Sequence, residues 1–582
     1  MPTLDFRNTN SLWGSVLVET LHRLGVTHAV ISPGSRSTPL TIAFAAHPGI
    51  ESIPVLDERS AAFFALGLAK RHRRPVVLLC TSGTAGANYF PAVIEAQESG
   101  VPLLVITADR PPEMRECRSG QTIDQQKLFG SHVNFYHELA VPVPSGPMLR
   151  YLRQTLAHAV ERTQYPLSGP VHLNAPFRDP LPPVEDGSAA GLKDMLDEEE
   201  FFGGVQPPLR STALLESLDF PATSRGVIVV GPSEDGWSPV DVGVIAGFAR
   251  DTGWPVLVDT LSGLRGDAGH FTNLVTRYDA IVRSAAAGEK LKPELVLCLG
   301  GWPTSKPLRA WLEACAPEVW LVTTRAQNLD PLHLTTHHVR GGLRSFVGSV
   351  VVAGKGPADY AEAWRKAESA AGASLEQAMA KAPGNFEGRT TVLLAQHLPK
   401  LTPVVVANSM PVRDVEYFWP GTDRAPQFYF NRGANGIDGT LSTALGVAHG
   451  HRPAVLLTGD LALLHDANGF LIGPKFKGSL TIVLINNAGG GIFEHLPVAA
   501  FDPPFEEFFA TPQSVDFMQL CAAHGAGYTL VRDAKHFSSL IAKLPPRGIR
   551  VLEVRTDRKK DASLRKKIFA AAATAAEKAI GG

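Results

Sequence analysis

Two polar turns in the C-terminal part of the chain could together bind a divalent cation and a phosphate group. Asp460 follows the apolar run PAVLL, and the pair Asn486-Asn487 follows the apolar run LTIVLI, with a helix-length segment between them. A β-α-β unit of this kind places the carboxyl ends of both strands at one edge of a parallel sheet, where ligands bind. Magnesium prefers oxygen ligands and shares them with phosphates. The spacing therefore predicts a magnesium site formed by Asp460, Asn487 and a backbone carbonyl near Gly489.

The three glycines that follow Asn487 favour close approach of the backbone to a ligand. Gly489, Gly490 and Gly491 tolerate positive φ, and a helix beginning near Ile492 would present its amides to phosphate oxygens. Each half alone also fits an ordinary turn after a core strand, because such dipeptides are common in turns. The spacing between the two halves favours a binding site.

This pair of motifs resembles the cofactor motif of thiamine-diphosphate enzymes, in which Gly-Asp-Gly and Asn-Asn bracket a segment of similar length. Leu461 stands where many of those enzymes have the second glycine. The resemblance implies thiamine diphosphate as cofactor, with Mg²⁺ or Mn²⁺ bound by Asp460, Asn487 and Gly489. The implied cofactor contacts are Glu58, Thr81, Ile437, Gly459, Asp460, Leu461, Asn487, Gly489, Ile492 and Phe493.

Glu58 is the candidate catalytic residue. It follows a short strand in SIPVLDERSAAFFALGLAK and opens an apolar helical segment. On local sequence alone it is a first-turn acid favoured by the helix dipole. A thiamine enzyme needs a carboxylate against its aminopyrimidine ring, and Glu58 fits that role. Ile437, in NRGANGIDG, is either the bulky apolar residue beneath the cofactor or a core residue after a glycine turn.

Four arginines follow predicted strands and could bind carboxylate substrates. They are Arg36 in SPGSRS, Arg110 in TADRPP, Arg413 in NSMPVRD and Arg432 in NRG. Guanidinium groups bind carboxylates in a bidentate manner. Each arginine alone fits a surface ion pair, but the set beside a thiamine site favours small polycarboxylate substrates.

The resemblance becomes more specific over residues 10–554. ISPGSRSTPL, LDERSAAFFALGLAK, TSGTAGANYFPAVIEA, ITADRPPEMREC, NSMPVRD, NRGANGIDGTLSTALG and GDLALLHDANG are similar to the family that makes 2-succinyl-5-enolpyruvyl-6-hydroxy-3-cyclohexene-1-carboxylate in menaquinone biosynthesis. The implied activity is a transferase reaction: decarboxylation of 2-oxoglutarate and conjugate addition of the succinyl carbanion to isochorismate. Both substrates are dianions, which agrees with the arginine set.

The family resemblance also implies a set of substrate contacts. These are Ser35, Arg36, Arg110, Gln121, Lys306, Arg413, Arg432, Phe493 and Leu496. Gly120 and Pro307 depart from the pattern, since some relatives carry a further polar or cationic side chain there. Because Glu58 and Asp460 fall in different domains, the resemblance implies a homodimer with active sites between subunits, and the sequence leaves a tetramer open.

Bulk composition excludes several classes of protein. The 582 residues include 19% charged residues with a net charge of −1, so electrostatics indicate neither a nucleic-acid nor a membrane-surface partner. No apolar run approaches the roughly 20 residues of a membrane span. The five cysteines show no CxxC spacing, and the N-terminus lacks a secretory pattern. We expect a cytoplasmic protein.

The elements that must position these residues form an α/β fold. Strand-like runs alternate with helical patterns, which predicts three consecutive α/β domains with mainly parallel sheets. By resemblance these are the pyrimidine, central and diphosphate domains of thiamine-diphosphate enzymes. The predicted limits are 1–185, 205–353 and 388–582, with linkers at 186–204 and 354–387.

Two other functions remain open from the sequence. An acetolactate-synthase-like carboligase acting on another 2-oxo acid would share most of the pattern. A simple decarboxylase is disfavoured, because the region where such enzymes carry paired histidines contains Arg110-Pro111-Pro112. A cofactor-binding protein without turnover is disfavoured by the presence of both Glu58 and Asp460.

Overall fold

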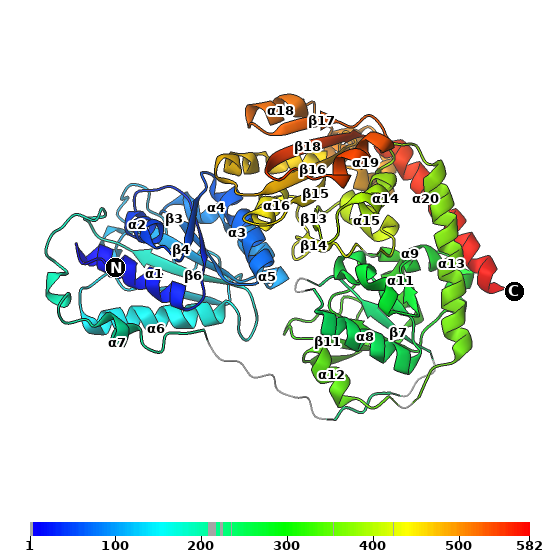
Figure 1. The fold of residues 1–582 in the computed structure, drawn as a ribbon, viewed down its shortest axis with the longest axis horizontal. Coiled ribbons are helices and arrows are strands. Elements are labelled where there is room, and N and C mark those ends of the chain that lie inside the picture. The colour runs from blue at the N-terminus through cyan, green and yellow to red at the C-terminus, as the bar shows by residue number, and fades with distance from the viewer. Residues whose placement is uncertain are drawn as a thin grey trace. The chain divides into compact units, whose positions relative to one another are not determined.

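The structure is a computed structural model, and the chain in it forms two compact units that we describe separately. It describes residues 4–207, 217–221, 225–233, 236–352, 354–422 and 424–581. Unit 1 comprises Met1–Arg210, Asn431–His451 and His465–Gly478, and unit 2 comprises Ser211–Phe430, Arg452–Leu464 and Ser479–Gly582. Figure 1 traces the chain through its helices and strands.

Unit 1 contains a parallel six-stranded sheet in the order β2-β1-β3-β4-β6-β5. Its strands are β1 (His28–Ile31), β2 (Glu51–Pro54), β3 (Val76–Cys80), β4 (Leu103–Asp109), β5 (Phe135–Glu138) and β6 (Pro170–Pro176). Helices α1 (Thr9–Arg23) and α6 (Gly146–Arg162) lie side by side along this sheet (Figure 1). The central strands are buried throughout because helices cover both faces, as the near-continuous apolar runs predict.

Unit 1 also includes a segment from the third part of the sequence. Helix α16 (Thr440–Ala448) packs along α3 (Glu58–His72). The turn before α16 therefore lies against the helix that begins with Glu58, since a side chain at Gly439 would overlap the ring of Phe63.

Unit 2 contains two further parallel six-stranded sheets. The central sheet has the order β12-β11-β10-β7-β8-β9, and the C-terminal sheet has the order β14-β13-β15-β16-β18-β17. Central strands are β7 (Gly226–Val230), β8 (Val256–Val258), β9 (Leu274–Val275), β10 (Leu295–Leu299), β11 (Glu318–Thr323) and β12 (Thr335–Arg340). C-terminal strands are β13 (Pro403–Val406), β14 (Gln427–Phe430), β15 (Ala454–Gly459), β16 (Ser479–Asn486), β17 (Gly527–Leu530) and β18 (Gly548–Arg555).

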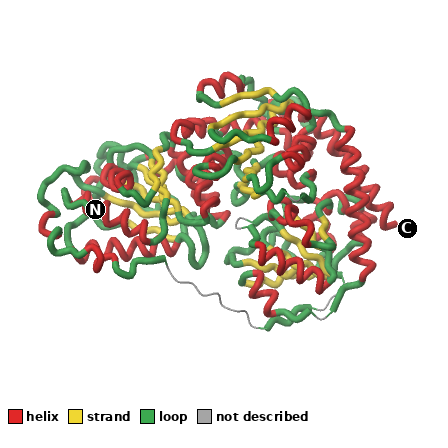
Figure 2. Tube along the Cα trace, in the orientation of Figure 1, coloured by secondary structure: helices red, strands yellow, loops and turns green. Residues whose placement is uncertain are grey.

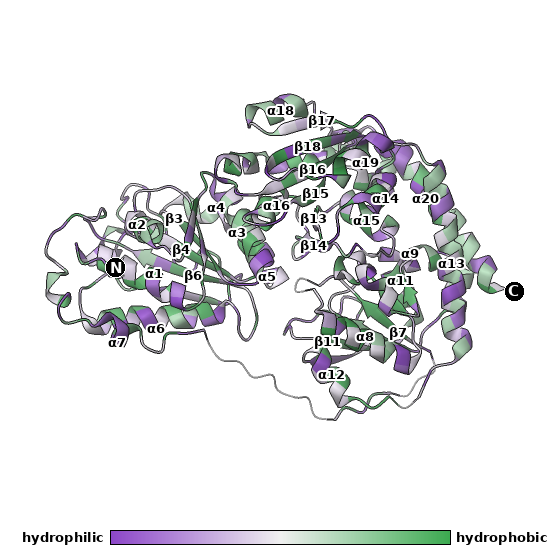
Figure 3. Ribbon diagram, viewed as in Figure 1, coloured by the Kyte–Doolittle hydropathy of each residue, from purple (hydrophilic) through white to green (hydrophobic). Residues whose placement is uncertain are grey.

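The three sheets confirm the predicted α/β fold class. In Figure 2 helices surround each group of strands, and in Figure 3 the strands carry most of the hydrophobic colour. The first and third sheets share one strand order. When the strands of each sheet are numbered along the chain, both orders read 2-1-3-4-6-5. Among the described residues, no helix combines the length and apolar character that crossing a membrane requires.

Both segments predicted as linkers contain helices that pack on neighbouring cores. In the first, α7 (Glu198–Phe202) buries Phe202 in the core of unit 1. In the second, α13 (Ala358–Lys381) lies beside the C-terminal helix α20 (Arg558–Gly581), as Figure 1 shows. Helix α14 (Glu387–His397) begins at the last residue of that second segment.

Candidate active site

Asp460 lies at the end of β15, as the sequence predicts, and its carboxylate is held by the backbone. One oxygen accepts a hydrogen bond from the Leu461 N–H at 2.8 Å, and the other accepts one from the Gly489 N–H at 2.8 Å. Burial raises the pKa of Asp460 to about 6, against the lowering effect of these two bonds. The carboxylate is therefore fixed between two strand ends, since β15 and β16 pair in parallel.

Asn487 supplies the second oxygen at this edge of the sheet. Its side chain is buried, its Nδ2 donates to Glu387 Oε1 at 2.7 Å, and its Oδ1 is buried without a hydrogen-bond partner. A buried carbonyl oxygen is costly to leave unpaired, and a hard cation would satisfy it. The residues present thus fit a magnesium site. No group of three His, Cys, Asp or Glu side chains suited to a metal occurs in the described part of the chain.

Gly489 brings its backbone to this position because it has no side chain. Its φ is 132°, and a Cβ there would lie 2.2 Å from the carbonyl oxygen of Ala510. A side chain at this residue would both strain the backbone and displace the neighbouring loop. The predicted contribution of the Gly489 carbonyl stays a prediction.

The helix expected near Ile492 is not an α-helix. The segment forms a single 3₁₀ element, η6 (Gly491–His495), which ends before Pro497. Proline disfavours helical backbone in the residue before it, and Leu496 is extended with φ −109° and ψ 155°. The predicted helix near Ile492 is therefore present as a short 3₁₀ helix, and its contact with a phosphate group stays a prediction. Ile492, Phe493 and Leu496 are half-buried.

In unit 1, Glu58 is the first residue of α3. Burial and the nearby charge of Glu58 both raise the pKa of the Cys80 thiol and of the Tyr89 phenol, which places this carboxylate near the end of β3. Thr81, the buried residue after β3, lies at the same strand end. Within the described residues, Glu58 has no ion-pair partner.

Two of the predicted arginines lie close together at this edge of the first sheet. The Arg36 N–H donates to Thr81 Oγ1 at 3.2 Å, and Arg36 Nη1 donates to the Phe177 carbonyl at 3.0 Å. Arg110 Nη1 donates to Ser82 Oγ and to the Gln121 carbonyl. Burial and the charge of Arg36 lower the pKa of Arg110. The two guanidinium groups therefore repel each other across a small distance.

Two nearby carboxylates partly offset this repulsion, since the charges of Asp109 and Asp179 raise the pKa of Arg110 against the effects of burial and Arg36. Arg36 also forms an ion pair with Asp179 at 3.9 Å, and the Asp179 side chain is 75% exposed. Ser35 is exposed in the same turn, and Gln121 Nε2 donates to the Ser82 carbonyl at 3.0 Å. An anion of two charges would suit this cluster, because it would relieve the repulsion and pair with both forks.

Unit 2 carries the remaining cationic candidates. Arg413 was predicted in a strand-end loop, but it lies in the first turn of α15 (Met410–Phe418). Its Nη1 donates to the Ser409 carbonyl at 2.6 Å. Lys306 is the exposed first residue of α11 (Lys306–Cys315). Burial lowers the pKa of Arg413, and the charge of Arg309 on α11 adds to this shift.

Arg309 was not found from the sequence. Its Nε is buried without a hydrogen-bond partner, and in the described part of the chain neither Arg309 nor Arg413 has a carboxylate in ion-pair contact. An arginine inside a helix gives no sequence signal that separates it from a solvated surface charge. Arg309 and Arg413 are thus a second pair of neighbouring cations, and the charge of Asp414 only partly offsets the lowered pKa of Arg413.

The predicted residues divide between the two units. Unit 1 holds Ser35, Arg36, Glu58, Thr81, Arg110, Gln121, Arg432 and Ile437. Unit 2 holds Lys306, Arg413, Gly459, Asp460, Leu461, Asn487, Gly489, Ile492, Phe493 and Leu496. Neither unit alone carries both the candidate acid and the candidate metal ligands.

Comparison with known proteins assigns the family. The chain matches the N-terminal binding domain, the middle domain and the C-terminal binding domain of thiamine pyrophosphate enzymes over residues 13–128, 190–404 and 415–554. It is 50% identical to the 2-succinyl-5-enolpyruvyl-6-hydroxy-3-cyclohexene-1-carboxylate synthase of Gloeothece citriformis, over 96% of this chain and 98% of the relative. It is 51% identical to the synthase of the same name from Trichormus variabilis, over 97% of this chain and 98% of the relative.

The chain belongs to this synthase family. It is therefore a thiamine-diphosphate-dependent enzyme, as the sequence motifs predict. Among solved structures, benzoylformate decarboxylase from Polynucleobacter necessarius is similar with a TM-score of 0.65 and 18% identity, over 94% of this chain and 98% of that chain. That likeness shows the shared fold alone.

In this member of the synthase family, a buried acid holds the loop with Arg432 and Ile437. Glu95, in α5 (Phe90–Ser99), is 3% exposed and accepts hydrogen bonds from the N–H groups of Gly433 at 2.9 Å and Ala434 at 2.7 Å. No sequence motif indicates this contact, because Glu95 lies 338 residues from Gly433 along the chain.

Two buried charge networks surround the unit 2 candidates of this synthase-family chain. In the first, Arg565 on α20 donates to both Glu387 and Asp414, with 2.8 Å from Nε to Asp414 Oδ1. All three side chains are buried. This network, which we call the Arg565 network, joins the partner of Asn487 to the residue next to Arg413.

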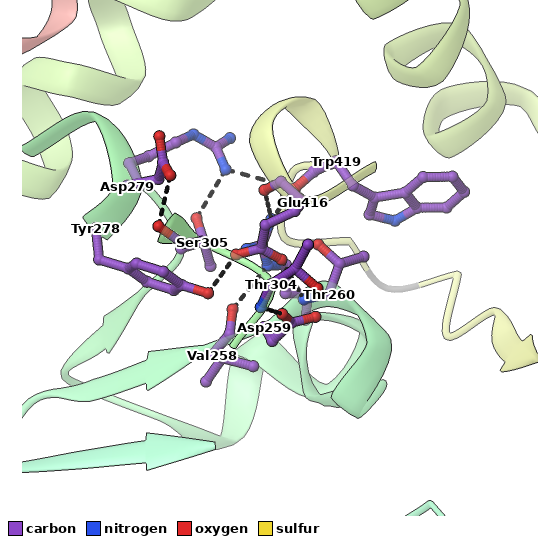
Figure 4. A network of polar contacts seen from close by, with 12 residues as sticks. Val258, Asp259, Thr260, Tyr278, Asp279, Thr304, Ser305, Glu416 and Trp419 are labelled. Carbon is purple, nitrogen blue, oxygen red and sulfur yellow. Dashed lines mark hydrogen bonds and ion pairs between the residues drawn. The ribbon is translucent and has the colours of Figure 1, made fainter. Parts of the chain in front are cut away.

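The second network is drawn in Figure 4 and is centred on Glu416. Arg265 donates to Glu416 Oε1 at 3.0 Å, Tyr278 donates to the same carboxylate, and the Thr260 N–H donates to Oε2 at 2.8 Å. Asp259 accepts from the Thr304 N–H at 2.7 Å. This Glu416 network ties the residues before α11 to α15, which carries Arg413.

Proposed function

We propose that this enzyme decarboxylates 2-oxoglutarate and adds the remaining succinyl unit in conjugate fashion to isochorismate. The products are 2-succinyl-5-enolpyruvyl-6-hydroxy-3-cyclohexene-1-carboxylate and carbon dioxide, in menaquinone biosynthesis. The name carried by the relatives that are 50% and 51% identical supports the assignment. The structural observation that carries it is two pairs of neighbouring arginines, Arg36 with Arg110 and Arg309 with Arg413, for which the described residues include no buried carboxylate in ion-pair contact.

Bound thiamine diphosphate supplies the electron sink that lets a 2-oxo acid lose carbon dioxide and its acyl carbon act as a nucleophile. In the proposal, Asp460, Asn487 and the Gly489 carbonyl hold Mg²⁺, or Mn²⁺, which in turn binds the diphosphate. Glu58 holds a proton at the aminopyrimidine ring, and Ile437 supports the cofactor from one side. Thr81, Gly459, Leu461, Ile492 and Phe493 complete the proposed cofactor contacts.

The arginines orient the substrates by their carboxylates. Guanidinium forks bind carboxylates through two parallel hydrogen bonds, and such charge-assisted bonds fix direction as well as position. Arg36, Arg110, Arg413 and Arg432 serve this role, with Ser35, Gln121 and Lys306 as further polar contacts and Phe493 and Leu496 as apolar ones. Arg309 joins the set because its partly buried guanidinium lies near Arg413.

A homodimer is part of the proposal. Neither unit carries Glu58 together with Asp460, and we propose that two subunits complete each site. We also keep the cytoplasmic location predicted from the sequence. Light scattering coupled to size exclusion tests the stoichiometry, and a monomer that is fully active at nanomolar concentration would contradict the shared site.

The direct test of function is a product assay. The protein is mixed with thiamine diphosphate, Mg²⁺, 2-oxoglutarate and isochorismate, and the reaction is followed by mass spectrometry. We expect the carbon-carbon adduct with loss of one carbon dioxide, and no adduct when either substrate is omitted. Turnover of pyruvate alone without the adduct would instead favour an acetolactate-synthase-like carboligase. Absence of any turnover with cofactor bound would favour a non-catalytic protein.

A further inference from the structure

The orientation of the Asn487 amide decides whether this residue can bind a cation. An asparagine side chain has a carbonyl oxygen, which accepts, and an NH₂ group, which only donates. Only the oxygen can be a metal ligand. The backbone of Asn487 does not select between the two orientations, so a neighbouring group must do so.

Glu387 is that neighbour. An ionised carboxylate can accept hydrogen bonds but cannot donate them, so it pairs with the NH₂ end of an amide. Glu387 Oε1 accepts from Asn487 Nδ2 at 2.7 Å, and Asn487 Oδ1 is left buried and without a partner. The opposite orientation would set two acceptor oxygens against each other.

Glu387 is itself held in place from several sides. Its Oε2 accepts from Arg565 Nη2, its Oε1 also accepts from Thr556 Oγ1 at 3.2 Å, and its own N–H donates to Asp561 Oδ2 at 3.1 Å. The side chain is 2% exposed. Water therefore does not compete for these contacts, and the carboxylate has little freedom to turn.

The other side of the Asn487 amide is closely packed. A Cβ at Gly491 would lie only 2.6 Å from Asn487 Nδ2. The NH₂ group thus occupies space that a side chain at residue 491 would need, so a glycine is required there for this orientation.

We propose that Glu387 is a positioning residue which fixes the Asn487 amide so that its carbonyl oxygen faces the cation of the metal site. This inference rests on the proposed metal ligands Asp460 and Asn487. It adds to the metal site a residue that lies outside the cofactor motif. Groups that orient metal ligands from behind typically change metal affinity about 10- to 100-fold when they are replaced.

The test begins with Glu387→Gln. The introduced amide must offer its oxygen to Arg565 Nη2, because its NH₂ group would repel the guanidinium. Its NH₂ group then faces Asn487, and the Asn487 amide turns to accept from it. We expect Mn²⁺ binding, measured by electron paramagnetic resonance of free Mn²⁺ with and without thiamine diphosphate, to weaken about 10- to 100-fold.

A second substitution should restore the site. In Glu387→Gln with Asn487→Asp, one carboxylate oxygen accepts from the introduced NH₂ group and the other remains for the cation. We expect Mn²⁺ affinity to return to within about threefold of wild type. Asn487→Asp alone sets two carboxylates against each other, so it should bind Mn²⁺ more weakly than the double variant.

The matched control is Glu416→Gln. Glu416 is as buried as Glu387 and pairs with a buried arginine in the same unit, but its partners are Arg265, Tyr278 and Thr260 (Figure 4). The Mn²⁺ affinity of the Glu416→Gln variant should equal that of wild type. A Glu387→Gln variant that binds Mn²⁺ like wild type would overturn the proposal, as would a double variant that binds no better than Asn487→Asp alone.

These outcomes are separate from the proposed substrates. Mn²⁺ binding is measured without 2-oxoglutarate or isochorismate, so an enzyme that makes a different product leaves the test intact. If Glu387→Gln does not fold, the comparison of Asn487→Asp with wild type remains decisive. If Glu387 does not set the orientation of residue 487, the extra negative charge of Asn487→Asp should strengthen Mn²⁺ binding relative to wild type. That result would also overturn the proposal.

Discussion

The charged residues of unit 1 near the first sheet edge and those of the Arg565 network in unit 2 differ in what compensates their charge. Arg36 and Arg110 bond to backbone carbonyls and hydroxyls, and each lies near the other's positive charge. Arg565 instead lies between two buried carboxylates, Glu387 and Asp414. Glu58 likewise has no ion pair within the described residues.

We interpret this difference in charge compensation as a difference in role: the unit 1 charges are proposed to bind a ligand, and the Arg565 network stabilises the fold. A buried ion pair with good geometry is strongly destabilised when one partner is removed, since the other charge stays buried and unpaired. A charge that only backbone groups solvate contributes less to stability. It remains available to a bound anion or cofactor. We therefore expect substitutions in the two regions to affect different measurements.

The largest expected effect concerns Glu58. Glu58→Gln keeps the size of the side chain but cannot hold the proton that the proposed role requires. We expect kcat to fall about 10²- to 10⁴-fold, with the melting temperature unchanged because no ion pair is lost. Single-turnover kinetics and differential scanning fluorimetry measure the two effects. A fall in kcat below about threefold would place Glu58 among the ordinary helix-start residues.

The next effect concerns the Arg565 network. Arg565→Met leaves Glu387 and Asp414 buried without their cation, and we expect unfolding to become easier by about 3–5 kcal/mol. Arg413→Met is the matched control, because Arg413 adjoins Asp414 in sequence but has no carboxylate in ion-pair contact within the described residues. It should cost less than about 1 kcal/mol. Urea titrations followed by tryptophan fluorescence compare them. Equal midpoints for the two variants would remove the distinction between compensated and uncompensated arginines.

Smaller effects are expected for the unit 1 arginines. In the proposed function, Arg36→Ala and Arg110→Ala would each remove charge-assisted bonds to a substrate carboxylate, and such bonds contribute about 1.5–3 kcal/mol. We expect kcat/KM for the dianionic substrates to fall about 10- to 100-fold, while the dissociation constant of thiamine diphosphate stays near that of wild type. Steady-state kinetics and calorimetry report these quantities. Parallel loss of cofactor affinity would mean that the arginines are structural.

The smallest effect is expected for Lys306. Arg309 and Lys306 lie on the same helix, but Arg309 Nε is buried whereas Lys306 is exposed. Water screens an exposed charge, so Lys306→Ala should raise KM by less than about threefold. Arg309→Ala should raise it about tenfold. A larger rise in KM for Lys306→Ala than for Arg309→Ala would show that burial of the charge does not determine which residue contributes more to substrate binding.

The sequence predicted the fold where burial and periodicity coincide. The buried strands β3, β4, β10 and β16 appear as apolar runs, and the strand-end positions of Asp460 and Asn487 follow from them. Strand β6 does not form an apolar run, because it buries polar residues, His172 and Asn174, which bond to Thr107 Oγ1 at 2.8 and 2.9 Å. Half-exposed edge strands such as β5 and β12 also lack a continuous apolar run.

The residues that sequence reasoning missed act through contacts that only the folded chain creates. Glu387 fell at the end of a predicted linker, in a stretch rich in alanine and glycine, and its contact with Asn487 spans 100 residues. Arg309 and Glu95 lie inside ordinary helices. Motif spacing identifies residues that share a turn or adjacent strand ends. It carries no information on a side chain that reaches a site from another helix.

The most direct test of the account compares a dianionic with a monoanionic 2-oxo acid. The ratio of kcat/KM for 2-oxoglutarate to that for 2-oxobutyrate is measured in wild type and in Arg413→Ala, with isochorismate as acceptor. If Arg413 binds the second carboxylate, we expect the ratio to be well above one in wild type. We expect it to fall about 10- to 100-fold in the variant, with the thiamine-diphosphate affinity unchanged. A ratio that Arg413→Ala leaves unchanged would contradict the assignment of this arginine to substrate charge.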